Sequence, residues 1–114
     1  MPPAGQTIDA VFRALSDPTR RRVVERLCRG PASVSELAEP FGMKLPSFVQ
    51  HLGILEKSLL VNSRKYGRVR IFSINLKRLK TAEDWIADQR QLWDCRLDQL
   101  DDYLLGLKQK KIPI

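Results

Sequence analysis

The sequence predicts a mainly α-helical fold that carries one two-stranded β-hairpin. Apolar residues recur every three or four positions in several segments between residues 8 and 57, which is the spacing of amphipathic helices. Residues 61–74 instead combine β-branched residues and arginines around a glycine turn, as hairpins do. Residues 82–107 return to helical spacing. With 114 residues, 43% of them hydrophobic, the chain is long enough for one compact domain but not for two.

Two short helices are predicted at the start of the chain, over residues 8–15 and from Pro18 onward. The second helix follows Ser16-Asp17, which supplies a cap residue before a proline suited to a first turn. Gly30-Pro31 is expected to end it. The residues expected to face the core are Ile8, Val11, Phe12, Leu15, Val23, Val24, Leu27 and Cys28.

Three consecutive arginines, Arg20 to Arg22, fall in the first turns of this second helix. The helix dipole disfavours cations at that end, so their presence suggests a use. One interpretation is contact with a phosphate group, and the other is an ion pair with Asp17 or Glu25. The sequence does not choose between the two.

Residues 33–57 are predicted to form a helix, a tight turn and a second helix. Ser33 and Glu36 have the spacing of a capping box, in which each side chain accepts the backbone amide of the other residue. Gly42 is expected to end the first helix in a left-handed conformation. The second helix tolerates Pro46 in its first turn and runs to about Lys57. The expected core residues of the two helices are Val34, Leu37, Ala38, Phe41, Phe48, Leu52 and Leu55.

The hairpin that follows is dense in positive charge, with its turn expected at Tyr66-Gly67. Two helices joined by a short turn and followed by a basic ribbon are the parts of a winged helix-turn-helix. Residues 44–70 carry six cations and one acid, a net charge of +5, whereas residues 82–107 carry a net −5 in a chain whose total is +7. This segregation concentrates the positive field on one helix and one hairpin, so we expect the partner to be duplex DNA.

A long helix is predicted at the C-terminal end. Asn75 is expected to cap a short turn, and Thr81 to cap a helix that continues to about Leu107. Its apolar surface is wider than a domain of this size needs, which favours a symmetric dimer that uses this helix together with the first one. The residues expected at the dimer interface are Val11, Phe12, Trp85, Ile86, Trp93, Leu97, Leu100 and Leu104.

The predicted organisation has four parts. Residues 1–7 are expected to be a disordered N-terminus, residues 8–75 the DNA-binding domain, residues 76–107 a dimerisation helix and residues 108–114 a basic tail. The sequence contains neither an apolar run long enough to cross a membrane nor a cationic start leading into a signal segment. Two cysteines without a secretory signal argue for a reducing compartment, so a cytoplasmic location is expected.

Several motifs resemble the ArsR-type (ArsR/SmtB) family of winged helix-turn-helix repressors. These motifs are FRALSDPTRRR at residues 12–22, SELA at 35–38, LPSFVQHLGILE at 45–56 and GRVRIFSIN at 67–75. The resemblance covers residues 8 to about 105. It implies a small homodimeric repressor with its first and last helices at the dimer interface. It also implies a palindromic operator whose major groove receives the second helix of each helix-turn-helix.

The residues expected to meet DNA lie on that helix and on the hairpin. Gln50 can pair with an adenine edge and Val49 can lie against a thymine methyl group. His51 has two interpretations, a DNA contact or a hydrogen bond that holds the helix in place. Relatives commonly carry hydroxyl residues where this chain has Lys44 and Val49, so the operator sequence cannot be inferred from them. The full set is Lys44, Ser47, Val49, Gln50, His51, Arg64, Lys65, Arg68 and Arg70.

Metal sensing, which is common in that family, is not expected here. Residues 34–42 contain no cysteine, and the predicted long helix contains no histidine. Cys28 and Cys95 stand alone on separate helices and are expected to be buried.

No cofactor and no enzymatic activity are expected, because no nucleophile or phosphate-loop motif is present. Three alternatives stay open: a thiol-redox-responsive repressor, a dimeric protein-interaction module and a sequence-tolerant architectural DNA binder. An unidentified effector also stays open.

Overall fold

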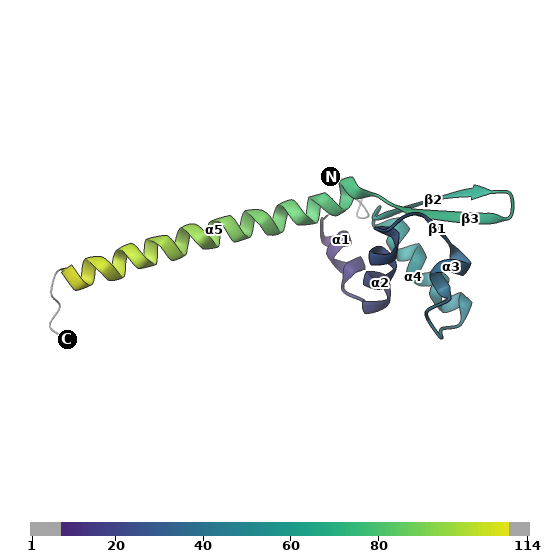
Figure 1. The fold of residues 1–114 in the computed structure, drawn as a ribbon, viewed down its shortest axis with the longest axis horizontal. Helices are drawn as coiled ribbons and strands as arrows, with labels where there is room; N and C mark the ends of the chain where they lie inside the picture. The colour runs from purple at the N-terminus through teal and green to yellow at the C-terminus, as the bar shows by residue number, and fades with distance from the viewer. Residues whose placement is uncertain (1–7, 110–114) are drawn as a thin grey trace. The chain divides into compact units, whose positions relative to one another are not determined.

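The computed structural model describes residues 8–109, so the predictions for residues 1–7 and for most of the basic tail lie outside it. The chain divides into two units, one ending at Ala82 and the other beginning at Glu83. No helix among the described residues is long and apolar enough to cross a membrane. The elements, labelled in Figure 1, are α1 (Ile8–Leu15), α2 (Pro18–Leu27), β1 (Ala32–Ser33), α3 (Val34–Ala38), α4 (Leu45–Lys57), β2 (Val61–Tyr66), β3 (Val69–Ile74) and α5 (Leu76–Gln109).

The first unit packs α1 to α4 and a small sheet around one core, which confirms the predicted mainly helical fold with a wing. Phe48 of α4 has no exposed surface, and its ring centroid lies 5.3 Å from that of Phe41. Because Phe48 anchors α4 in the core from one side, the opposite side of this helix stays exposed. The buried apolar core comprises Val11, Ala14, Val23, Val24, Leu27, Ala32, Leu37, Phe48, Leu52, Leu55, Leu60, Val61, Phe72 and Ala82.

The helix α3 confirms the predicted capping box but ends earlier than expected. The Ser33 hydroxyl accepts the Glu36 amide at 3.2 Å, and the Glu36 carboxylate accepts the Ser33 amide at 3.0 Å. The helix stops at Ala38, with Glu39 as its C-cap, rather than at Gly42. Pro40 explains this end, because its nitrogen carries no hydrogen and cannot donate the next helical hydrogen bond. Gly42 does not adopt a positive φ, so the prediction of a left-handed cap there was wrong.

The sheet has three antiparallel strands in the order β1-β3-β2, one more than predicted. The additional strand, β1, pairs Ala32 with Phe72 of β3. In the hairpin, Tyr66 pairs with Val69, so the two turn residues are Gly67 and Arg68, one position later than expected. Gly67 has a φ of 63°, which is the conformation that a tight hairpin turn requires of glycine.

The last helix starts at Leu76 and continues through the predicted break at Thr81. Asn75 caps it, because its side-chain oxygen accepts the Arg78 amide at 3.4 Å while its amide group donates to the Leu59 carbonyl at 2.9 Å. The Thr81 hydroxyl donates to the Lys77 carbonyl four residues earlier, as mid-helix threonines do. The prediction of a helix cap at Thr81 was therefore wrong.

Both cysteines are exposed, so the prediction that they are buried was wrong. The buried face of α2 ends at Leu27, and Cys28 is the C-cap residue that follows the last full turn. Cys95 lies in the second unit, where every residue from Glu83 to Leu105 is exposed in the single chain.

Candidate nucleic-acid interface

The helix α4 has one buried face and one exposed face. Phe48, Leu52 and Leu55 enter the core. Positions 47, 50, 51 and 54, which are three or four residues apart, form a stripe on another side of the helix. Within that stripe Ser47, Gln50 and Ile54 are exposed, and His51 is partly buried.

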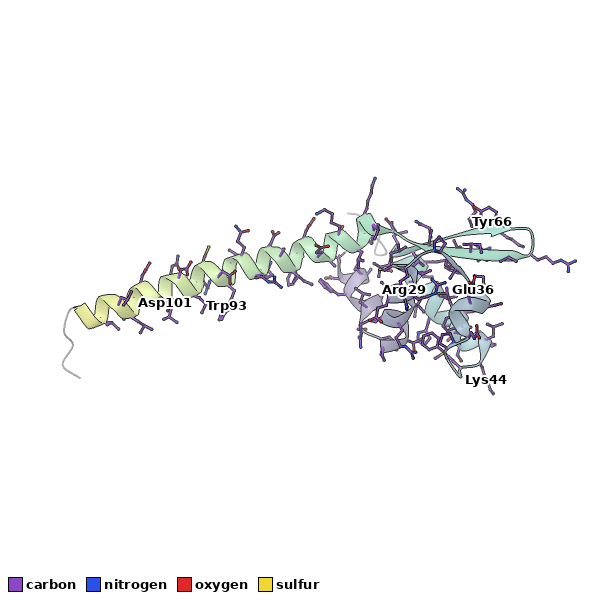
Figure 2. All side chains as sticks on the ribbon, in the orientation of Figure 1. Arg29, Glu36, Lys44, Tyr66, Trp93 and Asp101 are labelled. Atoms are coloured by element: carbon purple, nitrogen blue, oxygen red, sulfur yellow. The ribbon has the colours of Figure 1, made fainter. Side chains whose placement is uncertain are left out.

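The ends of α4 differ in how they are capped. Lys44 occupies the N-cap position and forms no side-chain cap hydrogen bond, because lysine carries no acceptor. Its side chain projects from the loop before α4, as Figure 2 shows, and adds a cation at the helix N-terminus. At the other end Leu59 adopts a φ of 65°, and the Leu60 amide donates to the Leu55 carbonyl at 3.2 Å. This Schellman arrangement turns the chain directly into β2.

Strand register separates the basic side chains of the wing into two faces. Side chains alternate across a strand, so Lys65 and Arg70, which pair with each other, share a face with the buried Phe72. Arg64 lies on the opposite face with Tyr66, whose side chain is labelled in Figure 2. The predicted set of wing cations is therefore divided: one group faces the α4 side of the sheet and Arg64 faces away from it. Arg68 belongs to the turn.

A hydrogen-bond chain joins the recognition helix to the wing. Ser63 of β2 donates to the Glu56 carboxylate of α4 at 2.9 Å, and Arg70 of β3 donates to the same Ser63 hydroxyl at 2.9 Å. Glu56 is the only acid between residues 44 and 70. This isolation among cations was a signal for a contact with one of them, but no role was predicted for Glu56. Because of these hydrogen bonds, one N–H donor of Arg70 is already used inside the protein.

Arg20 is buried, and it takes neither of the two roles that the sequence left open. Its side chain donates to the carbonyls of Ala14 and Arg13 at the end of α1, at 2.7 and 3.2 Å. Its terminal nitrogen Nη1 lies 3.1 Å from Nδ1 of His51 on α4. Asp17 accepts the backbone amide of Arg20 at 3.1 Å as the cap of α2. His51 is therefore held by a side chain rather than by a backbone carbonyl.

The charge state of Asp17 follows from these neighbours. Partial burial acts to raise the pKa of the Asp17 carboxyl, but the hydrogen bonds from the Arg20 and Thr19 amides and the positive charge of Arg20 act to lower it and prevail. The pKa of Asp17 therefore lies below its ordinary value, so the carboxylate caps α2 as an anion at neutral pH.

The other two arginines of the run at residues 20–22 are exposed and also make contacts within the unit. Arg21 donates to the Leu15 carbonyl at 2.9 Å, and the Arg22 guanidinium lies 4.6 Å from the centre of the Phe41 ring. Arg21 therefore helps to close the C-terminal end of α1, and Arg22 covers an aromatic ring of the core. These contacts account for much of the arginine run, although exposed guanidinium groups keep further donors.

The described residues contain no group of three or more His, Cys, Asp or Glu side chains placed to hold a metal ion. Cys28 and Cys95 belong to separate units of the chain. The one histidine is bonded to Arg20.

Comparison with known proteins gives consistent results. Residues 15–64 match a family model described as a helix-turn-helix domain. The chain is 33% identical over 78 residues to the transcriptional repressor SdpR of Bacillus subtilis, covering 68% of this chain and 87% of that protein. It is 49% identical to an ArsR family transcriptional regulator of known crystal structure, with a TM-score of 0.73 over 76% of this chain and 96% of that one.

The chain belongs to the ArsR family of winged helix-turn-helix transcription regulators. The resemblance inferred from the sequence motifs is thus confirmed, and with it the assignment as a DNA-binding regulator. Some relatives are named for resistance to mercury or to arsenicals. One is a probable mercury resistance operon repressor of Streptomyces lividans, 31% identical over 88 residues, which cover 74% of this chain and 70% of that protein.

Proposed function

We propose that this ArsR family member is a homodimeric repressor that binds a palindromic operator. The supporting observation is geometric: the wing face that carries Lys65 and Arg70 turns toward α4, whose Ser47 and Gln50 are exposed. One duplex can therefore meet the helix in its major groove and the wing on the adjacent backbone. Gln50 is the proposed base-reading residue, and Lys44, Lys65 and Arg68 are the proposed phosphate contacts.

The exposed apolar surface of α5 supports the dimer. Trp93 is 60% exposed in the single chain, and apolar residues follow it at intervals of three or four. A continuous stripe of exposed apolar side chains is unusual on a monomeric protein. A second copy of the same helix can bury the stripe, because a symmetric dimer packs the same surface of each copy together. Val11 is fully buried within its own chain, so we remove it from the proposed interface and retain Phe12. The proposed α5 residues are Trp85, Ile86, Trp93, Leu97, Leu100 and Leu104.

The proposed repressor does not respond to metals. Soft or borderline ions need clustered thiolate or imidazole ligands, and the described residues provide no such cluster. We expect zinc, copper or arsenite at modest excess to leave the complex with DNA intact. Release of the protein by any of the three would contradict this part of the proposal.

Thiol oxidation is the second candidate signal, because both cysteines are exposed. Exposure removes burial as an argument against a redox role. Peroxide treatment of wild-type, Cys28→Ser and Cys95→Ser proteins separates the readings: release of the wild type alone would establish a disulfide switch.

The experiment that tests the main proposal is selection of binding sites from a random duplex library. We expect the selected sequences to share an inverted repeat with half-sites about one helical turn apart, near 10 base pairs. The DNA upstream of the protein's own gene is the first natural fragment to test by footprinting. Selection of a single, non-repeated half-site would contradict the dimeric geometry.

A further inference from the structure

The Arg20 side chain forms hydrogen bonds with two helices other than its own. The residue is 9% exposed, and it reaches from α2 to the carbonyl groups at the end of α1. Its remaining contact is with Nδ1 of His51 at 3.1 Å, on the recognition helix. Burying a charged guanidinium is costly unless its donors are satisfied, so these hydrogen bonds are needed to keep Arg20 buried.

The chemistry of that contact fixes the state of the histidine. A guanidinium group only donates hydrogen bonds, so Nδ1 of His51 must be the acceptor. A ring that accepts at Nδ1 is neutral and carries its proton on Nε2. The same Nδ1 lies 3.7 Å from an Asp17 carboxylate oxygen, which is beyond hydrogen-bond distance, and that oxygen already accepts the Arg20 amide. The shorter Arg20 contact therefore decides the arrangement.

We propose that Arg20 is a positioning residue for DNA recognition, because it makes His51 present Nε2–H as a hydrogen-bond donor to the DNA. This inference rests on the proposed function. His51 shares its stripe with the exposed Ser47 and Gln50, and its side chain is 22% exposed. The two sequence-based interpretations of His51 are thereby combined: one ring nitrogen holds the helix, and the other meets DNA.

The matching DNA group is a hydrogen-bond acceptor. Phosphate oxygens, purine N7, guanine O6 and thymine O4 qualify, whereas the amino groups of adenine and cytosine are donors and do not. Phosphate and base acceptors are distinguished by comparing the affinity for a selected duplex with the affinity for random duplexes. Loss of the contact lowers affinity for both equally if the acceptor is a phosphate, and for the selected duplex alone if it is a base.

Two substitutions of His51 separate its two nitrogens. Asparagine places an amide near the position of Nδ1, and glutamine places one near Nε2. We expect His51→Asn to keep the wild-type Tm but to bind the selected duplex roughly fivefold to tenfold more weakly. We expect His51→Gln to lower the Tm by about 4–8 °C while retaining more of the affinity. Wild-type DNA binding by His51→Asn, or a wild-type Tm for His51→Gln, would overturn the proposal.

The role of Arg20 itself is tested by a double-mutant cycle. We expect Arg20→Lys to weaken DNA binding when His51 is present and to cause no further loss in the His51→Asn background. Equal losses in both backgrounds would reduce Arg20 to a structural residue. Because Arg20→Lys also removes hydrogen bonds to α1, the DNA binding of this variant is measured at a temperature where circular dichroism shows it folded.

A measurement without DNA keeps this inference separate from the proposed function. The chain has one histidine, so a two-bond proton–nitrogen NMR spectrum near pH 8 contains one imidazole signal set. We expect Nδ1 to be unprotonated and Nε2 to be protonated. A protonated Nδ1 would overturn the inference even if the protein binds its operator. Failure of the wild type to bind any duplex would instead overturn the proposed function and with it the DNA contact.

Discussion

Two adjacent cations on the wing should affect DNA binding differently. Lys65 and Arg64 are both exposed and one residue apart in β2, but register places them on opposite faces of the sheet. Lys65 shares the face that turns toward α4, and Arg64 does not. Lys65→Ala should therefore remove a phosphate contact, whereas Arg64→Ala removes the same charge without removing a contact.

The expected size follows from counterion release. Each lost phosphate contact flattens the slope of log K against log salt by about 0.9. The proposed complex contains two wings, so Lys65→Ala should flatten the slope by about 1.8. The affinity deficit of the variant should then shrink about tenfold between about 50 mM and about 200 mM salt.

Fluorescence anisotropy with a labelled duplex at four or more salt concentrations provides the measurement. Arg64→Ala is the matched control, and its slope should stay close to that of the wild type. Equal flattening by the two substitutions would mean that the face assignment does not govern DNA contact. An unchanged slope for Lys65→Ala would remove the wing face from the interface.

Three further expectations concern other parts of the molecule. Gln50→Ala should relax base preference at one position per half-site, at a cost of roughly 1–3 kcal/mol on the preferred duplex, and equal losses on random DNA would make Gln50 a positioning residue. Ser33→Ala should destabilise the fold by about 0.5–2 kcal/mol in thermal unfolding. Hydrogen bonds from the Ser33 amide and hydroxyl hold the pKa of Glu36 below its ordinary value. The stability that the ionised Glu36 gives to the fold through these hydrogen bonds is present above the unfolded carboxyl pKa and is lost as the pH falls. The effect of Ser33→Ala on stability should therefore shrink in acid. Trp93→Asp should place a charge at the proposed seam and halve the mass found by light scattering, and an unchanged dimer would move the interface elsewhere.

The elements that sequence reasoning predicted well depend on local signals. The spacing of Phe48, Leu52 and Leu55 defined α4, and the Ser33–Glu36 capping box defined the start of α3. The glycine turn located the hairpin to within one residue. Each of these signals involves residues within a few positions of one another, so no knowledge of the packed fold was needed.

The features that were missed depend on contacts distant in the sequence. The strand β1 has only two residues, and its pairing partner Phe72 lies 40 positions away. Arg20 and His51 are 31 residues apart, and either side chain alone allows several partners. Cys28 follows the apolar stripe of α2 but falls just past the last helical residue, so helical periodicity wrongly placed it inside.

If α4 and the wing form a sequence-specific DNA interface, the protein must bind its operator much more tightly than unrelated DNA. Anisotropy titrations near 150 mM salt compare the selected inverted repeat with a shuffled duplex of the same composition. We expect a ratio of about 10³ or more in favour of the repeat, with two chains bound per duplex. Equal affinity for both duplexes would indicate an architectural DNA binder, and no affinity for either would indicate a protein-interaction module.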